Sequence, residues 1–153
     1  MLALLFGCSN FSIDVTGDGI ELNPTAAYFG ASYILLLEEA LSCQDMYWVQ
    51  KTNLDGETPP YDSNLKALQM TFNSEDGMVF KGSHSLGGTS AIKAELLTIK
   101  GEEFSVVRAT EGILDVNELE NEAAVTGAFN FVFPTGSLSG TFENIPWCIN
   151  IKP

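Results

Sequence analysis

Basic residues are scarce in this chain of 153 residues. It has 7 lysines and arginines against 20 aspartates and glutamates, which gives a formal net charge of -13. Such a surface repels both nucleic-acid phosphates and anionic lipid headgroups. Nucleic-acid binding is therefore disfavoured, and any attachment to a membrane requires an anchor and not a basic face.

Long hydrophobic runs are also missing. A spanning helix needs about 20 consecutive apolar residues, whereas the longest apolar stretch, Ala26–Leu37, is interrupted by Tyr28, Gly30, Ser32 and Tyr33. We interpret Ala26–Leu37 as one strand that is covered on both faces. With 45% hydrophobic residues, the chain is suited to one domain with a substantial core.

Histidine occurs once, at His84. It lies in Ser83-His84-Ser85-Leu86-Gly87-Gly88, which is one residue away from the nucleophile elbow of many lipases, with Ser85 as the nucleophile. Ser83 replaces the first glycine of that motif, and the chain has no second histidine to act as the general base. We therefore predict a polar loop at Gly82–Ser90, no enzyme activity and no cofactor.

Alternating apolar and polar residues predict an all-β domain. The strongest pattern is Val125–Phe133, which places three phenylalanines on one face. A turn at Ser74–Gly77 is expected to lead directly into a return strand. The other expected strands are Phe11–Val15, Ile20–Leu22, Met46–Val49, Leu65–Asn73, Met78–Phe80, Ile92–Leu96, Phe104–Arg108 and Leu138–Phe142. We expect about eight to ten antiparallel strands in a single domain, with a β-sandwich favoured over a flattened β-barrel.

Two acidic segments are weak candidates for calcium binding. Asp14–Gly19 resembles the first half of a calcium loop, with Asp14 and Asp18 as ligands, but Thr25 occupies the position of the bidentate acid. A plain hairpin turn is the preferred interpretation. The run Glu111–Glu122 carries five acids, and it is interpreted as a solvated face or an irregular strand.

The apolar residues Met1–Phe6 are followed by Gly7 and Cys8. The segment Leu5-Phe6-Gly7-Cys8 resembles the lipobox of bacterial lipoproteins, which implies that Cys8 is lipidated and anchors the chain to a membrane. Ser9, in place of an aspartate, points to the outer membrane. The predicted division is residues 1–7 as the remnant of a lipoprotein signal, 8–25 as the anchor and an N-terminal hairpin, and 26–153 as a single β domain. The alternative is an ordinary N-terminal strand that contains a cysteine.

Three cysteines are present, and lipidation of Cys8 would leave Cys43 and Cys148 as a pair. An exported chain can oxidise such a pair. The disulfide would close a loop of roughly 100 residues, which is worth about 4 to 5 kcal/mol in the chain-entropy model. The alternative is two buried free thiols in a cytosolic protein. No spacing typical of a zinc site is present.

The segment Ser139-Gly140-Thr141-Phe142…Pro146-Trp147-Cys148 lies in the last fifteen residues of the sequence. It is similar to the Gly-x-Phe…Cys ending of small bacterial outer-membrane lipoproteins of the myxobacterial type. This resemblance implies a cellular location and a fold class, and it does not imply an activity. We expect an exported, lipid-anchored envelope protein with a structural or partner-binding role. The sequence does not identify whether the partner is a protein or a glycan. The alternative is a module for a small ligand or carbohydrate, possibly calcium-dependent, that binds near Tyr47, Trp48 and Trp147.

Overall fold

The computed structural model describes residues 10–46, 64–73, 77–87, 92–101 and 103–149. They form ten strands and one helical turn at residues 43–46. The strands are β1 (Ser12–Asp18), β2 (Ala26–Phe29), β3 (Tyr33–Leu37), β4 (Asn64–Phe72), β5 (Gly82–Ser85), β6 (Ile92–Lys100), β7 (Glu103–Arg108), β8 (Glu111–Glu120), β9 (Ala124–Phe133) and β10 (Gly136–Pro146). Within these ranges, no helix is long and apolar enough to cross a membrane.

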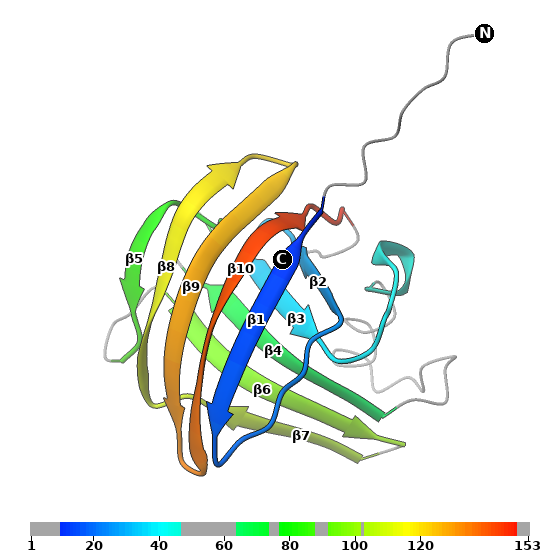
Figure 1. Cartoon of the computed structure of the whole chain (residues 1–153), viewed down its shortest axis with the longest axis vertical. Coiled ribbons are helices and arrows are strands. Elements are labelled where there is room, and N and C mark those ends of the chain that lie inside the picture. The colour runs from blue at the N-terminus through cyan, green and yellow to red at the C-terminus, as the bar shows by residue number, and fades with distance from the viewer. Residues whose placement is uncertain (1–9, 47–63, 74–76, 88–91, 102, 150–153) are drawn as a thin grey trace, which may run out of the picture.

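The strands form two antiparallel sheets of five strands each. Sheet A has the order β1-β10-β9-β8-β5, and sheet B has the order β2-β3-β4-β6-β7. Sheet A lies in front of sheet B in Figure 1, and the strands of the two sheets run in clearly different directions. The sheets do not close into a barrel, so the predicted all-β fold and the preference for a sandwich are confirmed.

The main core lies between the sheets and follows the alternation seen in the sequence. Phe129, Phe131 and Phe133 of β9 are buried on the inner face of sheet A, and the first two rings stack with centroids 5.2 Å apart. Leu68, Met70 and Phe72 of β4 approach them from sheet B within the same apolar cluster. Period-two alternation therefore identified the inward face of β9 correctly.

The predicted strand Ala26–Leu37 is two strands, β2 and β3, which pair with each other in an antiparallel hairpin. Gly30 donates a backbone hydrogen bond to Tyr33 O at 2.9 Å, which closes the turn. The apolar run concealed the hairpin because Ser32, the polar residue of the turn, is itself buried. The inference that this stretch is covered on both faces is correct, since Ile34, Leu35, Leu36 and Leu37 are all buried.

The expected N-terminal hairpin within residues 8–25 is wrong. β1 pairs along its whole length with β10, from Ser12 opposite Glu143 to Asp18 opposite Ser137. Residues 20–25 form no strand. The first strand therefore completes the edge of sheet A and packs Ile13 and Val15 against the main core.

The hairpin expected at Ser74–Gly77 is also wrong. Residues 78–80 form no strand, and β4 pairs with β6. The chain instead crosses to sheet A, where residues 82–85 of the expected polar loop form β5 beside β8. Val79 is buried on this crossing, and its backbone N–H bonds to Ala31 O at 2.7 Å.

Gly127 marks a close approach between neighbouring strands within sheet A. A Cβ atom at this position would collide with the backbone oxygen of Asp115 and would lie 2.7 Å from Cζ of Phe142. The side chain of Phe142 is fully buried, so it has no free space to move into.

We predict that Gly127→Ala lowers the free energy of unfolding by about 1 to 3 kcal/mol, because the added methyl group overpacks the core. Urea denaturation followed by tryptophan fluorescence measures the change. The control is Ala128→Val, which adds bulk to the outer face of the same strand and should change stability by less than about 0.5 kcal/mol. Equal stability of Gly127→Ala and the wild type would contradict this account of the packing.

Candidate interaction surfaces

Sheet B carries a second apolar cluster on its outer face, which we call the outer cluster. One cross-strand row of it runs from Leu37 through Ala67 to Leu97. Met46 and Cys148 cover these residues and are themselves completely buried. The buried members of the outer cluster are Ala26, Leu35, Leu37, Met46, Leu65, Ala67, Leu97, Ile99 and Cys148.

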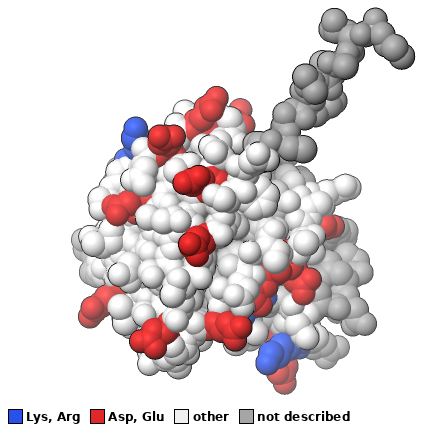
Figure 2. Space-filling view, in the orientation of Figure 1, with Lys and Arg blue, Asp and Glu red and all other residues white. Residues whose placement is uncertain are grey.

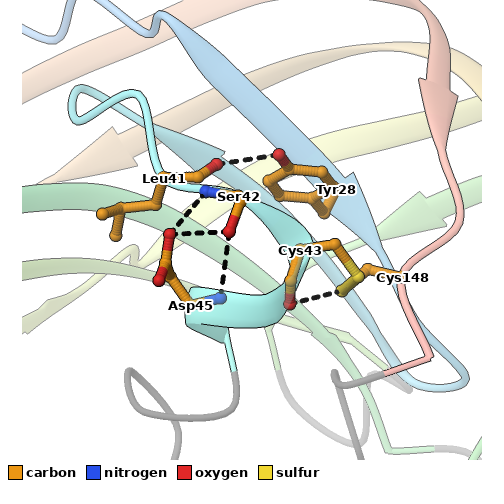
Figure 3. Close-up of a disulfide and its surroundings, with 6 residues drawn as sticks. All are labelled: Tyr28, Leu41, Ser42, Cys43, Asp45 and Cys148. Carbon is orange, nitrogen blue, oxygen red and sulfur yellow. Dashed lines mark hydrogen bonds between the residues drawn. A yellow bond between two sulfur atoms is a disulfide. The ribbon is translucent and has the colours of Figure 1, made fainter.

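A disulfide between Cys43 and Cys148 holds this cover in place, as the cysteine count predicted. The two Cα atoms are 5.5 Å apart and 105 residues apart in sequence. Cys148 follows β10, and its N–H donates to the carbonyl oxygen of Phe29 in β2 at 2.8 Å. The disulfide therefore links the end of a sheet A strand to the segment that covers sheet B (Figure 3).

A capping box begins the helical turn that carries Cys43. Ser42 N–H donates to the Asp45 carboxylate at 2.9 Å, and Asp45 N–H donates to Ser42 Oγ at 3.3 Å (Figure 3). The Ser42 hydroxyl also donates to the same carboxylate at 2.7 Å. These hydrogen bonds from Ser42 hold the pKa of Asp45 below its ordinary value. The Ser-x-x-Asp spacing was a readable signal for this cap, and our sequence analysis missed it.

Tyr28 fixes the same segment from β2. Its hydroxyl donates to the carbonyl oxygen of Leu41 at 2.8 Å. Burial raises the pKa of Tyr28, and the nearby negative charge of Asp45 raises it further. The phenol therefore stays protonated and keeps its hydrogen bond well beyond neutral pH. Residues 38–46 are thus attached to sheet B by apolar packing and by hydrogen bonds from the Tyr28 hydroxyl to Leu41 O and from Glu38 N–H to Lys66 O. The disulfide joins the same segment to Cys148 after β10.

Of the predicted aromatic site, only Trp147 lies within the described residues. Its ring packs edge-to-face on Phe29 with the centroids 5.2 Å apart, and it contacts the main core. Tyr47 and Trp48, like the proposed lipidation site Cys8, lie outside the described residues. Trp147 therefore takes part in core packing, and the three aromatics are not shown to share a site.

Asp14 and Asp18 do not form a calcium loop. Both lie on the extended strand β1, four residues apart, which separates them by about 13 Å at 3.4 Å per residue. One calcium ion requires all its ligand oxygens within about 2.6 Å of the metal. The run Glu111–Glu122 is mostly strand β8, whose register with β9 shifts between Val116 and Glu118, as expected for an irregular strand. In the described part of the chain, no group of three or more His, Cys, Asp or Glu residues could hold a metal.

Ser85 and His84 are consecutive residues of β5, so their side chains point to opposite faces of sheet A. His84 is buried, whereas Ser85 is exposed. His84 Nε2 lies 3.0 Å from the carbonyl oxygen of Phe80, and because a carbonyl only accepts, Nε2 carries the hydrogen. The ring also packs edge-to-face on Phe72 and Phe80. The geometry does not join the serine and the histidine as a catalytic pair.

Charge is divided between the two sheets. The strands of sheet A contain no lysine or arginine. Figure 2 shows acidic side chains scattered over this face, with basic side chains only near its rim. The acidic residues of the sheet A strands are Asp14, Asp18, Glu111, Asp115, Glu118, Glu120 and Glu143. The sheet B strands hold Lys66, Lys93, Lys100 and Arg108 against Glu95 and Glu103. The outer face of sheet A is therefore the negative side of the molecule.

Hollows on the surface of the described residues include one beside each sheet. One of about 440 Å³ is lined by Thr98, Lys100, Glu103, Phe104 and Ser105 at the ends of β6 and β7. Another of about 230 Å³ lies beside the β8–β9 hairpin and includes Lys81, Glu118 and Asn144 among its lining residues. Trp147 lines neither of these two hollows, whereas Phe104 lines the first.

No protein-family model, curated protein or solved structure matches this chain. What the chain does must therefore be inferred from its own geometry and charge.

We predict that the double substitution Cys43→Ala and Cys148→Ala lowers the free energy of unfolding by about 4 to 5 kcal/mol, since the disulfide closes a loop of 105 residues. Urea denaturation at neutral pH measures the loss. The wild type in the presence of dithiothreitol is the control and should be destabilised to a similar extent. A loss below about 1 kcal/mol would show that the cover is held by packing alone.

We predict that Ser42→Ala raises the pKa of Asp45 and costs about 1 kcal/mol of stability, because it removes the N-cap. The lowered pKa of Asp45 in the native state means that its hydrogen bonds stabilise the fold above the pKa of the unfolded chain. This stabilisation is lost as the pH falls through the native pKa. NMR titration of the Asp45 carboxyl carbon measures the shift, with the exposed Ser139→Ala as the control. An unchanged titration midpoint in Ser42→Ala would contradict the capping box.

Proposed function

We propose that this chain is an exported envelope protein, held at the outer membrane by acyl chains on Cys8, with a structural or partner-binding role and no catalysis. The observation that carries the proposal is the disulfide between Cys43 and Cys148. Structural disulfides persist in oxidising compartments and are rare in the cytosol. With these two cysteines joined, Cys8 is the third, and it is the cysteine that follows the lipobox-like residues Leu5–Gly7.

The short distance between Cys8 and the first strand supports a role close to the membrane surface. β1 begins at Ser12, four residues after Cys8. A chain of four residues spans at most about 14 Å. Acyl chains on Cys8 would therefore hold the end of sheet A where Ser12 pairs with Glu143 directly above the lipid headgroups.

The charge of sheet A supports an acyl anchor over electrostatic attachment. Glu143 lies opposite Ser12, and Glu120 ends β8 in the same sheet. Anionic headgroups repel these carboxylates, whereas two or three acyl chains bind stably at about 0.8 kcal/mol per buried methylene. A partner that approaches the outer face of sheet A would for the same reason be cationic.

A non-catalytic role is supported by the placement of the residues that chemistry would need. His84 and Ser85 face opposite sides of β5, and His84 is occupied by its contact with Phe80. Asp14 and Asp18 lie too far apart to share one cation. A binding role uses surfaces and charges that the sandwich does present.

The intact mass of the protein from its native envelope, measured without reductant, tests the proposal. We expect a chain that starts at Cys8, is heavier by its acyl groups and is lighter by the two hydrogen atoms lost on forming the disulfide. The matched control is Cys8→Ser, which should remain unprocessed and unacylated but should keep the disulfide. An unacylated wild-type chain with three free thiols would overturn the export and the anchor together.

A further inference from the structure

The two sheets have four edge strands, which are β1 and β5 in sheet A and β2 and β7 in sheet B. An edge strand exposes unpaired backbone N–H and C=O groups, and it pairs readily with a strand from another chain. Natural proteins prevent this pairing with charged residues, very short strands or a covering segment. The four edges of this sandwich differ in whether they have such protection.

Three of the edges are protected. β1 carries Asp14 and Asp18, and β5 has only four residues. β2 also has four residues, and the carbonyl oxygen of Phe29 at its end is occupied by the N–H of Cys148. Trp147 forms an isolated parallel bridge with Phe29 at the same place.

β7 has none of these protections along its centre. Its six residues run Glu-Phe-Ser-Val-Val-Arg, so the four central ones are uncharged. Phe104 is 48% exposed and Val106 is 44% exposed. Among the described strands only β6 pairs with β7, through Ile99 opposite Phe104 and Leu97 opposite Val106. The exposed pair therefore extends the outer cluster to the open edge of sheet B.

We propose that β7 pairs with β7 of a second copy of this chain, in antiparallel orientation about a two-fold axis at Ser105. In this register, Phe104 lies opposite the partner's Val106, and Ser105 lies opposite the partner's Ser105. Directly opposed residues in an antiparallel pair share one face of the sheet. The register therefore places both Phe104–Val106 pairs on the outer face, where they join the outer clusters of the two copies.

Charge identifies a second copy as the occupant of this edge. Two chains of net charge -13 repel each other across most of their surfaces. β7 is the exception, because its own charges, Glu103 and Arg108, sum to zero. Glu95 of the neighbouring strand forms an ion pair with Arg108 at 2.6 Å. The other charges of the sheet B strands are three lysines, so two copies meet here without an excess of carboxylates.

The pairing is expected to be weak in solution. It pairs about five residues of β7 from each copy, against about 20 to 30 on each side of a standard interface. A reversible dimer that forms at high protein concentration is the expected state. The inference is independent of the proposed lipid anchor, because it depends only on the folded sandwich.

Sedimentation velocity of the full chain carrying Cys8→Ser tests the pairing without interference from acyl chains. We expect this protein to shift from monomer to dimer as its concentration rises to the sub-millimolar range. Adding Val106→Lys should weaken the association by roughly tenfold or more, since a lysine on an edge strand blocks pairing. The matched control is Val132→Lys, which alters a residue that is 41% exposed but lies on the central strand β9.

Cross-linking tests the register. Ser105→Cys should form an intermolecular disulfide on mild oxidation, because the two Cα atoms would lie within the 4.4 to 6.8 Å that a disulfide requires. Glu103→Cys on the same face should not, because the two copies of residue 103 would be four residues out of register, or about 13 Å apart. A monomer at every concentration, or equal cross-linking of both variants, would overturn the proposal. Neither result would affect the mass test of the anchor.

Discussion

Sheet B is apolar on both faces, and the rest of the structure depends on this constraint. Every residue of β3 after Tyr33 is buried, so neither face of this strand meets water. Sheet A covers one face through Phe129, Phe131 and Phe133. The other face needs a separate cover, which residues 38–46 supply with Met46 and the disulfide. Each apolar side chain buried in this way contributes about 1.5 to 3 kcal/mol, so neither cover is dispensable.

The same constraint explains which parts of the fold were predictable from sequence. One face of sheet A is exposed to solvent, so β9 alternates along its length and β10 alternates as far as Phe142. This alternation identified their core residues in those segments. In β2 and β3 both faces are buried, so the alternation of apolar and polar residues disappears. The two strands and their turn at Gly30–Ser32 therefore looked like one apolar run in the sequence. Strand pairing was the hardest feature to predict from the sequence. β1 pairs with β10 and β4 pairs with β6, and the paired residues are far apart in the sequence.

Some features of the candidate surfaces can be read from a short stretch of sequence, and others depend on residues that only the fold brings together. Counting cysteines predicted the Cys43–Cys148 pair, because the third cysteine had its own assignment. The capping box at Ser42 and Asp45 was a local signal and could have been read. The segregation of charge could not, since acids from β1, β8 and β10 gather on one sheet only after the strands are ordered. The unprotected edge of β7 likewise becomes visible only when its neighbours are known.

The proposed anchor and the proposed pairing together restrict how two copies could meet. Figure 1 looks onto the sheets, with the start of β1 at the upper right and β7 at the bottom, so β1 begins at the end of the sandwich opposite β7. A two-fold axis normal to sheet B rotates the second copy by 180° within this plane. The β1 strand of the second copy therefore begins at the opposite end of the dimer. The tether spans at most about 14 Å. The 11 residues of β10 extend for about 36 Å, so the tether is too short to return past the domain. In a fully tethered dimer the two copies would therefore be anchored in facing membrane surfaces and not side by side in one membrane.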